Sequence, residues 1–401
     1  MDDVDRDRIV LAAVVCTVLF AQVLIYPGVA EIVATLGAAT DFDASQWFLG
    51  VEFLSFVLFA SVWGAASDAL GRRTPLVAAG AIGGAMGYLV LAVLPSLGGV
   101  PFEVVLAIRA IQGAMTIGAL SLGMAMLMDL PGGHGRNMGA AGIAIGIGVA
   151  TGSPVGGVLA ARDPLFVMSV AGVVLLSAGL ATLLLVDRVP RTDRDGVRDV
   201  LVSLTDTREL AIPYAFGFID RLTAGFFALA GTFYFRDVFG LGPAERGLML
   251  ALFFAPFALL QYPFGSLSDR IGRRIPVVGG SLAYGLAVMT VGVAGSLAGV
   301  QVAMVAVGVL GALMAPATMA LVTDLAGDDQ RGAAMGGFNI FGSLGFLTGI
   351  LAAQAAMVLG YRDAFLLVGG LEIAIALVAI VPLLRLDLPV PDALGLDRWS
   401  R

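Results

Sequence analysis

Charged side chains inside apolar stretches are the residues of this chain best suited to chemistry. Glu52, Arg109, Asp220, Arg221 and Glu372 each lie within a hydrophobic run long enough to cross a bilayer. A charge at the bilayer centre costs about 2.5–3.5 kcal/mol even on a lenient insertion scale, so each needs a partner, a wet cavity or a function. Such residues are typical of proton relays and of sites that hold ionic substrates.

The depth of these charges along their helices predicts which of them meet. With a fixed rise per residue, Glu52 and Arg109 lie about 9 and 11 Å from the outer ends of their spans, and they can form an ion pair. Asp220 lies about 15 Å from the cytoplasmic end of its span, where it either exchanges a proton or forms a structural ion pair. Its neighbour Arg221 points about 100° away and needs a different partner or a wet cavity. For Glu372, on the last span, we expect a local partner.

The composition requires that these residues be carried by membrane helices. Of 401 residues, 59 % are hydrophobic and 13 % charged, and the mean hydropathy is +0.95. A soluble domain carries about 25 % charged residues. The expected fold is therefore an all-α membrane protein with twelve transmembrane helices. The internal repeat described below indicates that they form two pseudo-symmetric six-helix bundles. The apolar runs cover approximately residues 9–30, 46–67, 75–94, 102–128, 138–161, 165–186, 210–235, 247–267, 276–294, 300–323, 333–359 and 364–384.

The longest polar break divides these spans six and six. Residues 1–186 are expected to form an N-terminal six-helix bundle, and residues 210–401 a C-terminal six-helix bundle with a cytoplasmic tail. Between them, residues 187–209 form a cytoplasmic linker. Its apolar residues recur at i, i+3, i+4 and i+7, which favours a short helix on the membrane surface, with a flexible linker as the alternative.

The distribution of arginine predicts the orientation of the chain. Seventeen of the 23 arginines lie in alternate loops beginning with the N-terminus, and four lie in the opposite set. By the positive-inside rule, both termini are expected in the cytoplasm of a multi-pass protein of the cell membrane.

The charge inventory also excludes classes of function. The 30 acidic residues outnumber the 23 basic ones, all of them arginine, and the net charge of −7 argues against nucleic-acid binding. This acidic, lysine-free composition predicts a salt-loving source, with a GC-rich genome as the alternative explanation. The single cysteine, Cys16, excludes an internal disulfide and a cysteine metal cluster. The absence of a Walker loop, zinc motif or nucleophile elbow argues against an enzyme and against an ATP-driven pump. The expected partners are a small-molecule substrate and the bilayer, with no cofactor or metal and a monomeric chain.

An internal repeat is the strongest pattern in the sequence. Residues 64–75 read GAASDALGRRTP and residues 265–276 read GSLSDRIGRRIP, an offset of 201 residues with seven of twelve positions identical. Both copies follow the second span of a half, as expected for secondary transporters built from repeated halves. The positions that carry the pattern are Gly64, Asp68, Gly71, Arg72 and Arg73, and then Gly265, Asp269, Gly272, Arg273 and Arg274.

This G-x-x-x-D-x-x-G-R-R loop, present twice in a twelve-span chain, resembles the signature of the major facilitator superfamily over essentially the whole chain. The resemblance implies that the loops act as a latch that stabilises one conformation. Structural anchoring of the loops, through helix N-termini, head groups or carboxylates, is the alternative.

Two further segments resemble motifs of proton-coupled members of that family. Residues 109–113 (RAIQG) look like the R-x-x-Q-G motif of proton-coupled facilitators. Residues 148–157 (GVATGSPVGG) resemble the G-x-x-x-G-P-x-x-G-G motif of drug/proton antiporters, although the proline stands one place late. Ordinary glycine packing with a proline kink is the alternative for the second segment. Its motif residues are Gly148, Gly152, Pro154, Gly156 and Gly157.

The resemblance implies a substrate cavity lined by spans one, four, seven and ten, and with it a function. We expect a secondary transporter that works by alternating access and exports small, largely apolar compounds in exchange for protons. The alternatives are symport or uniport of a sugar, metabolite or organic anion, with Arg109 or Arg221 as its carboxylate ligand, and a non-transporting receptor or scaffold. The expected coupling and cavity residues are Asp220, Arg221, Arg109, Gln112, Glu52, Gln22 and Tyr26.

Overall fold

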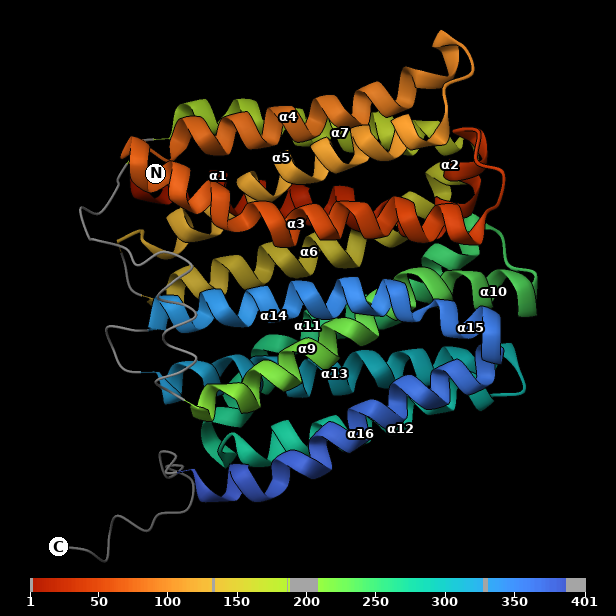
Figure 1. Cartoon of the computed structure of the whole chain (residues 1–401). Helices are drawn as coiled ribbons and strands as arrows, with labels where there is room; N and C mark the ends of the chain where they lie inside the picture. The colour runs from red at the N-terminus through yellow and green to blue at the C-terminus, as the bar shows by residue number, and fades with distance from the viewer. Residues whose placement is uncertain (1–2, 132–133, 186, 188–207, 327–330, 387–401) are drawn as a thin grey trace, which may run out of the picture. The chain divides into compact units, whose positions relative to one another are not determined.

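The computed structural model describes residues 3–131, 134–185, 187, 208–326 and 331–386 (Figure 1). Within these ranges the regular secondary structure is entirely helical. The expected linker falls outside the described residues except for Asp187, Arg208 and Glu209, and so does the C-terminal tail after Leu386. The prediction of a surface helix in the linker therefore stays a prediction.

Eleven helical segments of the described chain are long and apolar enough to cross a membrane. The remaining expected span, the seventh (210–235), is built from α9 (Ala211–Phe226), a π-helical turn η5 (Phe227–Gly231) and α10 (Thr232–Phe239), so its α-helix is interrupted in the middle. Many large apolar side chains remain exposed, with Tyr262 at 83 % and Val378 at 77 %, as expected for surfaces that face lipid. The all-α fold and its membrane spans are thus confirmed.

Contacts divide the chain into two compact units, which we describe separately. Unit 1 comprises Met1–Gly196 and Phe227–Ala258, and unit 2 comprises Val197–Phe226 and Leu259–Arg401. Residues 227–258 were expected in the C-terminal bundle but belong to unit 1. They comprise the end of the seventh span and most of the eighth, and they pack against the N-terminal helices. The boundaries of the two functional halves stay a prediction.

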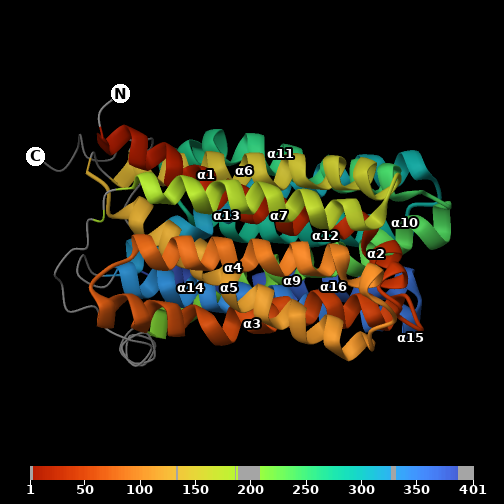
Figure 2. The same cartoon turned by 90° about the horizontal axis from the view of Figure 1, so that it is seen from above.

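Unit 1 is built around α1 and α4. In the view of Figure 2, α4 lies beside α7, and it also packs along α5, while α1 packs against α5, α6 and α7. The helices of this unit are α1 (Asp3–Val23), α2 (Val29–Thr35), α3 (Phe42–Leu70), α4 (Thr74–Val93), α5 (Phe102–Met128), α6 (His134–Ala160), α7 (Pro164–Ala181), α10 and the first part of α11 (Pro243–Ile271).

The ends of α3 show how the sequence sets the helix limits in unit 1. At its start, the Asp41 carboxylate accepts a hydrogen bond from the Phe42 N–H at 2.8 Å, which satisfies one of the free amides of the first turn. At its end, Gly71 adopts a φ of 60°, a left-handed conformation that favours glycine. The first copy of the repeat therefore starts inside α3 and turns the chain into α4.

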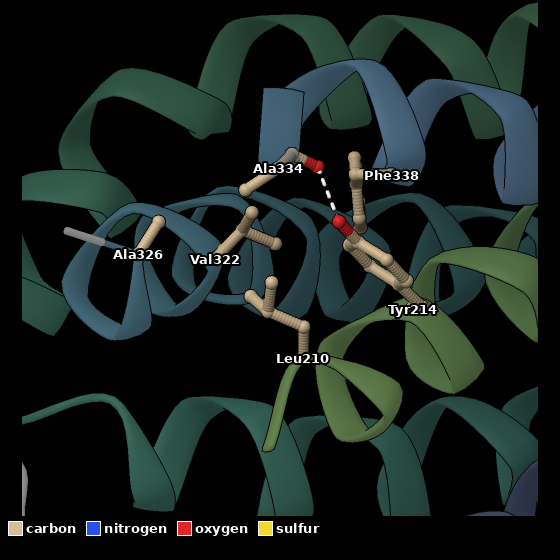
Figure 3. Close-up of a cluster of buried hydrophobic side chains, with 6 residues drawn as sticks. All are labelled: Leu210, Tyr214, Val322, Ala326, Ala334 and Phe338. Carbon is tan, nitrogen blue, oxygen red and sulfur yellow. Dashed lines mark hydrogen bonds between the residues drawn. The ribbon is translucent and has the colours of Figure 1, made fainter. Parts of the chain in front are cut away.

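Unit 2 is held together mainly by α9 against α14 and by α12 against α16. Its other helices are the last part of α11, α13 (Leu297–Leu325) and α15 (Gln354–Leu359), while α12, α14 and α16 span Gly280–Val293, Arg331–Ala352 and Tyr361–Arg385. A buried cluster fixes the start of α9, and within it the Tyr214 hydroxyl donates to the Ala334 carbonyl at 2.7 Å (Figure 3). The cluster consists of Leu210, Tyr214, Val322, Ala326, Ala334 and Phe338.

Candidate functional site

A fully buried ion pair lies at the centre of the charged residues in unit 1. Glu52 on α3 and Arg109 on α5 are both 0 % exposed, and the Arg109 Nη2 atom lies 2.5 Å from the Glu52 Oε2 atom. This is the pair expected from the matched depth of the two residues along their helices. Its role in transport stays a prediction.

Every nitrogen of the Arg109 guanidinium has a partner. Nη1 donates to the Gln112 Oε1 atom at 2.6 Å, and Nε donates to the Phe48 carbonyl at 3.3 Å. The guanidinium carbon lies 4.6 Å from the centroid of the Phe48 ring and 5.2 Å from that of Tyr88, within range of cation–π attraction. A substrate carboxylate would have to displace one of these partners to bind Arg109.

The carboxylate of Glu52 is held from a third helix as well. Its Oε1 atom accepts from Gln112 Nε2 at 3.3 Å and from the Tyr88 hydroxyl of α4 at 3.4 Å. Tyr26, in the turn after α1, is close enough to interact electrostatically with Glu52 and Arg109. We refer to Glu52, Tyr88, Arg109 and Gln112 as the buried charge network.

Two members of the expected cavity lining on the first span differ in their environment. Gln22 is 5 % exposed, and its Nε2 atom is buried without a hydrogen-bond partner, whereas Tyr26 is 1 % exposed and lies near the network. Tyr88 was not among the expected residues, because it lies on the third span, which the resemblance does not place along the cavity.

The glycine of the R-x-x-Q-G segment explains why α3 and α5 meet at this point. A Cβ atom on Gly113 would lie 2.9 Å from the Glu52 carbonyl oxygen and 3.0 Å from its Cα atom. Only a residue without a side chain allows the two backbones to approach this closely. The segment thus contains the charged Arg109, its hydrogen-bond partner Gln112 and Gly113, whose close packing brings the Glu52 carboxylate within reach of both.

Asp220 and Arg221 belong to unit 2, on α9. Arg221 is exposed and Asp220 is half-buried, and Asp220 interacts electrostatically with Arg221, Tyr284 and Glu372. An arginine at this depth of a membrane span is costly in contact with lipid, so the expectation of a partner or a wet cavity for Arg221 stays a prediction. Among the described residues, no three metal-ligating side chains gather into a group that could hold a metal ion.

The first copy of the repeat is anchored through its second arginine. Arg73 is 3 % exposed, its Nη1 atom lies 2.6 Å from Asp129 Oδ2 at the end of α5, and its backbone N–H donates to the Asp187 carboxylate at 3.2 Å. Asp68 is exposed, and its one hydrogen bond within the described residues comes from Ser67 Oγ at 3.4 Å. The structure therefore shows contacts of this loop with Asp129 and Asp187, and both the anchoring and the latch interpretation stay predictions.

The second copy is anchored through its first arginine. Arg273 contacts Asp269 at 2.5 Å and Asp324, near the end of α13, at 3.0 Å. Burial acts to lower the pKa of Arg273, but the hydrogen bonds to Asp324 and Asp269 outweigh it and raise that pKa. Arg274 donates to the Leu386 carbonyl at 2.5 Å. In both copies, an arginine of the loop binds an aspartate at the end of the fourth span of its half.

The glycines of residues 148–157 form the face of α6 that packs on α1. A Cβ atom on Gly148 would lie 2.5 Å from the Cys16 carbonyl oxygen, one on Gly152 would lie 2.9 Å from that of Phe20, and Gly156 contacts the Leu24 backbone. Unit 2 repeats this arrangement, because Gly345 and Gly349 of α14 contact the Phe218 and Leu222 carbonyls of α9. Gly157 contacts the backbone at Pro243, and Pro154 lies within α6.

Two ion pairs that the sequence did not predict connect residues 227–258 to the first helices of unit 1. Arg236 Nη1 lies 2.6 Å from Asp41 Oδ2, and Arg246 pairs with Glu31. Burial acts to raise the pKa of Asp41, but the hydrogen bond and charge of Arg236 outweigh it and hold that pKa below its usual range. The Arg246 side chain is 1 % exposed, and its Nε and Nη1 atoms have no hydrogen-bond partner.

Comparison with known proteins identifies a protein family that matches most of the chain. Residues 11–236 and 214–398 match the sequence profile described as the Major Facilitator Superfamily. Over 144 residues, the chain is 29 % identical to a probable L-galactonate transporter of Escherichia coli strain K12, a match that covers 35 % of this chain and 32 % of that protein. The chain thus matches about a third of that relative's length.

Solved structures share the fold over nearly the whole chain. A bacterial homologue of the human lysosomal transporter Spinster, in an inward-facing and unoccupied conformation, has a TM-score of 0.76 at 13 % identity and covers 95 % of this chain and 96 % of that one. The human organic anion transporter MFSD10 has a TM-score of 0.70 at 20 % identity, with coverage of 94 % and 99 %. At these identities the likeness shows the fold alone.

Proposed function

As a member of the Major Facilitator Superfamily, the chain is a membrane transporter, and we propose that it exports small, largely apolar compounds in exchange for protons. The proposed cycle is alternating access, driven by the proton gradient without a cofactor. The arginine distribution supports a position in the cell membrane with both termini in the cytoplasm.

The observation that carries the proposal is the buried charge network. A buried ion pair is often no more stabilising than apolar residues of the same volume, so Glu52 and Arg109 gain little as a purely structural device. Protonation of Glu52 would instead remove the charge that holds Arg109 and weaken the contact between α3 and α5. A carboxyl whose protonation changes helix packing is what coupling a proton to a conformational change requires.

Asp220 is the proposed group where proton and substrate compete. It is half-buried beside the exposed Arg221, at a depth where its charged form is costly. The glycine face of α6 supports exchange as the mode, because it forms the close helix contact implied by the antiporter-like motif. The loops at Asp68 and Asp269 are proposed to stabilise one conformation.

Transport of an organic anion is the second candidate, and the exposure of Arg221 favours it. An arginine that faces a cavity within a span can bind a substrate carboxylate through two hydrogen bonds, whereas every nitrogen of Arg109 is already engaged. The relative from Escherichia coli is named for L-galactonate, a sugar acid that carries such a carboxylate.

The two candidates separate in sealed vesicles that contain the purified protein and an imposed pH gradient. Lipophilic cations, drugs, sugars and organic anions are added in turn while internal pH is followed. Export in exchange for protons predicts that cations or drugs dissipate the gradient, that Asp220→Asn abolishes this response with ligand binding retained, and that the exposed control Asp363→Asn behaves as wild type.

Three results would contradict the first candidate. Uptake of a labelled anion without proton movement, lost in Arg221→Gln, would establish the second candidate in its place. Undiminished coupled transport in Asp220→Asn would remove Asp220 from the mechanism. If the wild-type protein moves none of these compounds, and Asp220→Asn and Arg109→Ala are both tolerated, the protein is a receptor or scaffold.

A further inference from the structure

Glu372 on α16 is a buried carboxyl in unit 2 to which the proposed transport cycle assigns no role. Its side chain is 0 % exposed, and its Oε1 atom accepts a hydrogen bond from the Ser281 hydroxyl of α12. Its Oε2 atom is also buried and has no hydrogen-bond partner. The chain contains no lysine, and no arginine of the described residues forms an ion pair with Glu372.

Close packing of α12 and α16 encloses this carboxyl. A Cβ atom on Gly285 would lie 2.6 Å from the Gly369 carbonyl oxygen, and one on Gly369 would lie 2.5 Å from the Gly285 carbonyl oxygen. The same Cβ on Gly285 would lie 3.2 Å from the Glu372 Cβ atom. Backbone contact between two helices thus lies within one turn of Glu372 and closes off one side of it.

Two further polar groups on neighbouring helices interact electrostatically with the carboxyl. Tyr284 of α12 is 0 % exposed, and its hydroxyl has no hydrogen-bond partner. Tyr284 interacts electrostatically with both Glu372 and Asp220, and Asp220 of α9 interacts with Glu372. Arg221, the charged neighbour of Asp220, is exposed, and α15 and η6 (Ile275–Gly279), which also pack on α16, carry no ionisable side chain.

An ionised Glu372 would have one hydrogen bond and no counter-charge at a depth where burial of an ion costs several kcal/mol. Two neighbouring carboxyls also disfavour the simultaneous ionisation of both. We propose that Asp220 and Glu372 form a carboxyl pair in unit 2 that binds one proton, held on Glu372 in the conformation seen here. When the proton passes from the Oε2 atom to the Asp220 carboxylate, the negative charge moves to Glu372, where the Ser281 hydroxyl donates to it.

The part of this pair in transport rests on the proposed proton coupling, whereas the existence of the site does not. Infrared spectroscopy of the full chain in lipid tests the site, because a protonated carboxyl has a C=O stretching band that a carboxylate lacks. We expect this band at neutral pH to lose one component in Glu372→Gln, which keeps the acceptor for Ser281. It should be unchanged in Asp363→Asn, whose carboxyl is exposed on the same helix.

Coupling to Asp220 is tested in the chain that keeps Glu372. Removing the neighbouring negative charge in Asp220→Asn makes ionisation of Glu372 easier, so its band should vanish at a lower pH than in wild type. An unshifted band would overturn the pair, and so would a spectrum that Glu372→Gln leaves intact. Loss of the band on addition of Na⁺ at constant pH would show that sodium competes with the proton for this site. That result would also overturn the proposal.

A transport measurement separates the failure of this inference from the failure of the proposed function. If the pair carries the coupled proton, Glu372→Gln should lose uphill, proton-driven transport and keep the exchange of labelled for unlabelled substrate at equal concentrations. If wild type moves no protons while the Glu372 band is present, the proposed function is wrong and the proton site stands. If wild type moves protons and Glu372→Gln drives transport as well as wild type, the proposed function stands and the pair has no part in it.

Discussion

Removal of both partners from the buried charge network should destabilise the protein by less than the sum of the two single removals. Glu52→Gln leaves the Arg109 charge at a position with 0 % exposure, with only Gln112, the Phe48 carbonyl and two aromatic rings for compensation. Breaking one side of a buried pair costs about 3–5 kcal/mol, and these remaining partners place the expected loss near the lower end, about 3 kcal/mol. We expect a similar loss for Arg109→Gln, which leaves the Glu52 carboxylate with Gln112 and Tyr88.

The double variant Glu52→Gln/Arg109→Gln contains no uncompensated charge. It should therefore be more stable than the sum of the two single losses predicts, with a coupling energy of up to about 3 kcal/mol. Glu103→Gln is the matched control, because this carboxyl is exposed at the start of α5 and its loss should change stability by no more than about 0.5 kcal/mol.

Reversible unfolding in mixed micelles provides the assay, with tryptophan fluorescence as the signal. Trp63 of α3 donates its indole N–H to the Ala114 carbonyl of α5 at 2.6 Å, so its emission reports on the same pair of helices that the network joins. Additive losses in the double variant would refute the reasoning, because they would mean that Glu52 and Arg109 do not stabilise each other.

Three further predictions follow from other contacts of the structure. Asp68→Asn should slow conformational cycling and leave substrate affinity nearly intact, and a collapse in affinity would reject the latch. Asp41→Asn should lower the unfolding temperature slightly at neutral pH, because its pKa is depressed in the folded protein by Arg236. This contribution is complete above the unfolded pKa of about 3.9 and is lost as pH falls through the lower folded pKa, so a difference that persists in strong acid would contradict it. Gly156→Ala should cost about 1–3 kcal/mol in unfolding experiments by overpacking α6 on the α1 backbone, whereas Gly142→Ala on the same helix, with open space at its Cβ, should be tolerated; equal losses would reject the packing argument.

The two copies of the repeat differ in a contact that their sequence symmetry does not predict. The two copies are identical at seven of twelve positions, yet Arg73 binds an aspartate in the first copy and Arg273, one position earlier in the repeat, binds one in the second. The identity of the motif therefore predicts that an arginine anchors the loop. Which arginine does so depends on the direction from which α5 or α13 presents its last aspartate.

Other contacts depended on which helices become neighbours. Asp41 and Arg236 are separated by 195 residues, and they meet because the end of the seventh span packs in unit 1. No local pattern encodes such a contact, since each residue taken alone reads as an ordinary charge near the end of a span. The division of contacts at Phe227 similarly falls at a π-helical turn that hydropathy does not reveal.

The sequence by itself determined the membrane class, the spans, the family resemblance and the depth of each buried charge. Depth could be predicted because the rise per residue of a helix is constant, and this was enough to pair Glu52 with Arg109. Only the tertiary structure decided which side of each helix faces which neighbour, and so added Tyr88 to the network and enclosed Glu372 beside Ser281. Helix rotation and partner choice are set by backbone contacts between residues far apart in the chain, such as Gly113 against Glu52, which no periodicity along a single helix encodes.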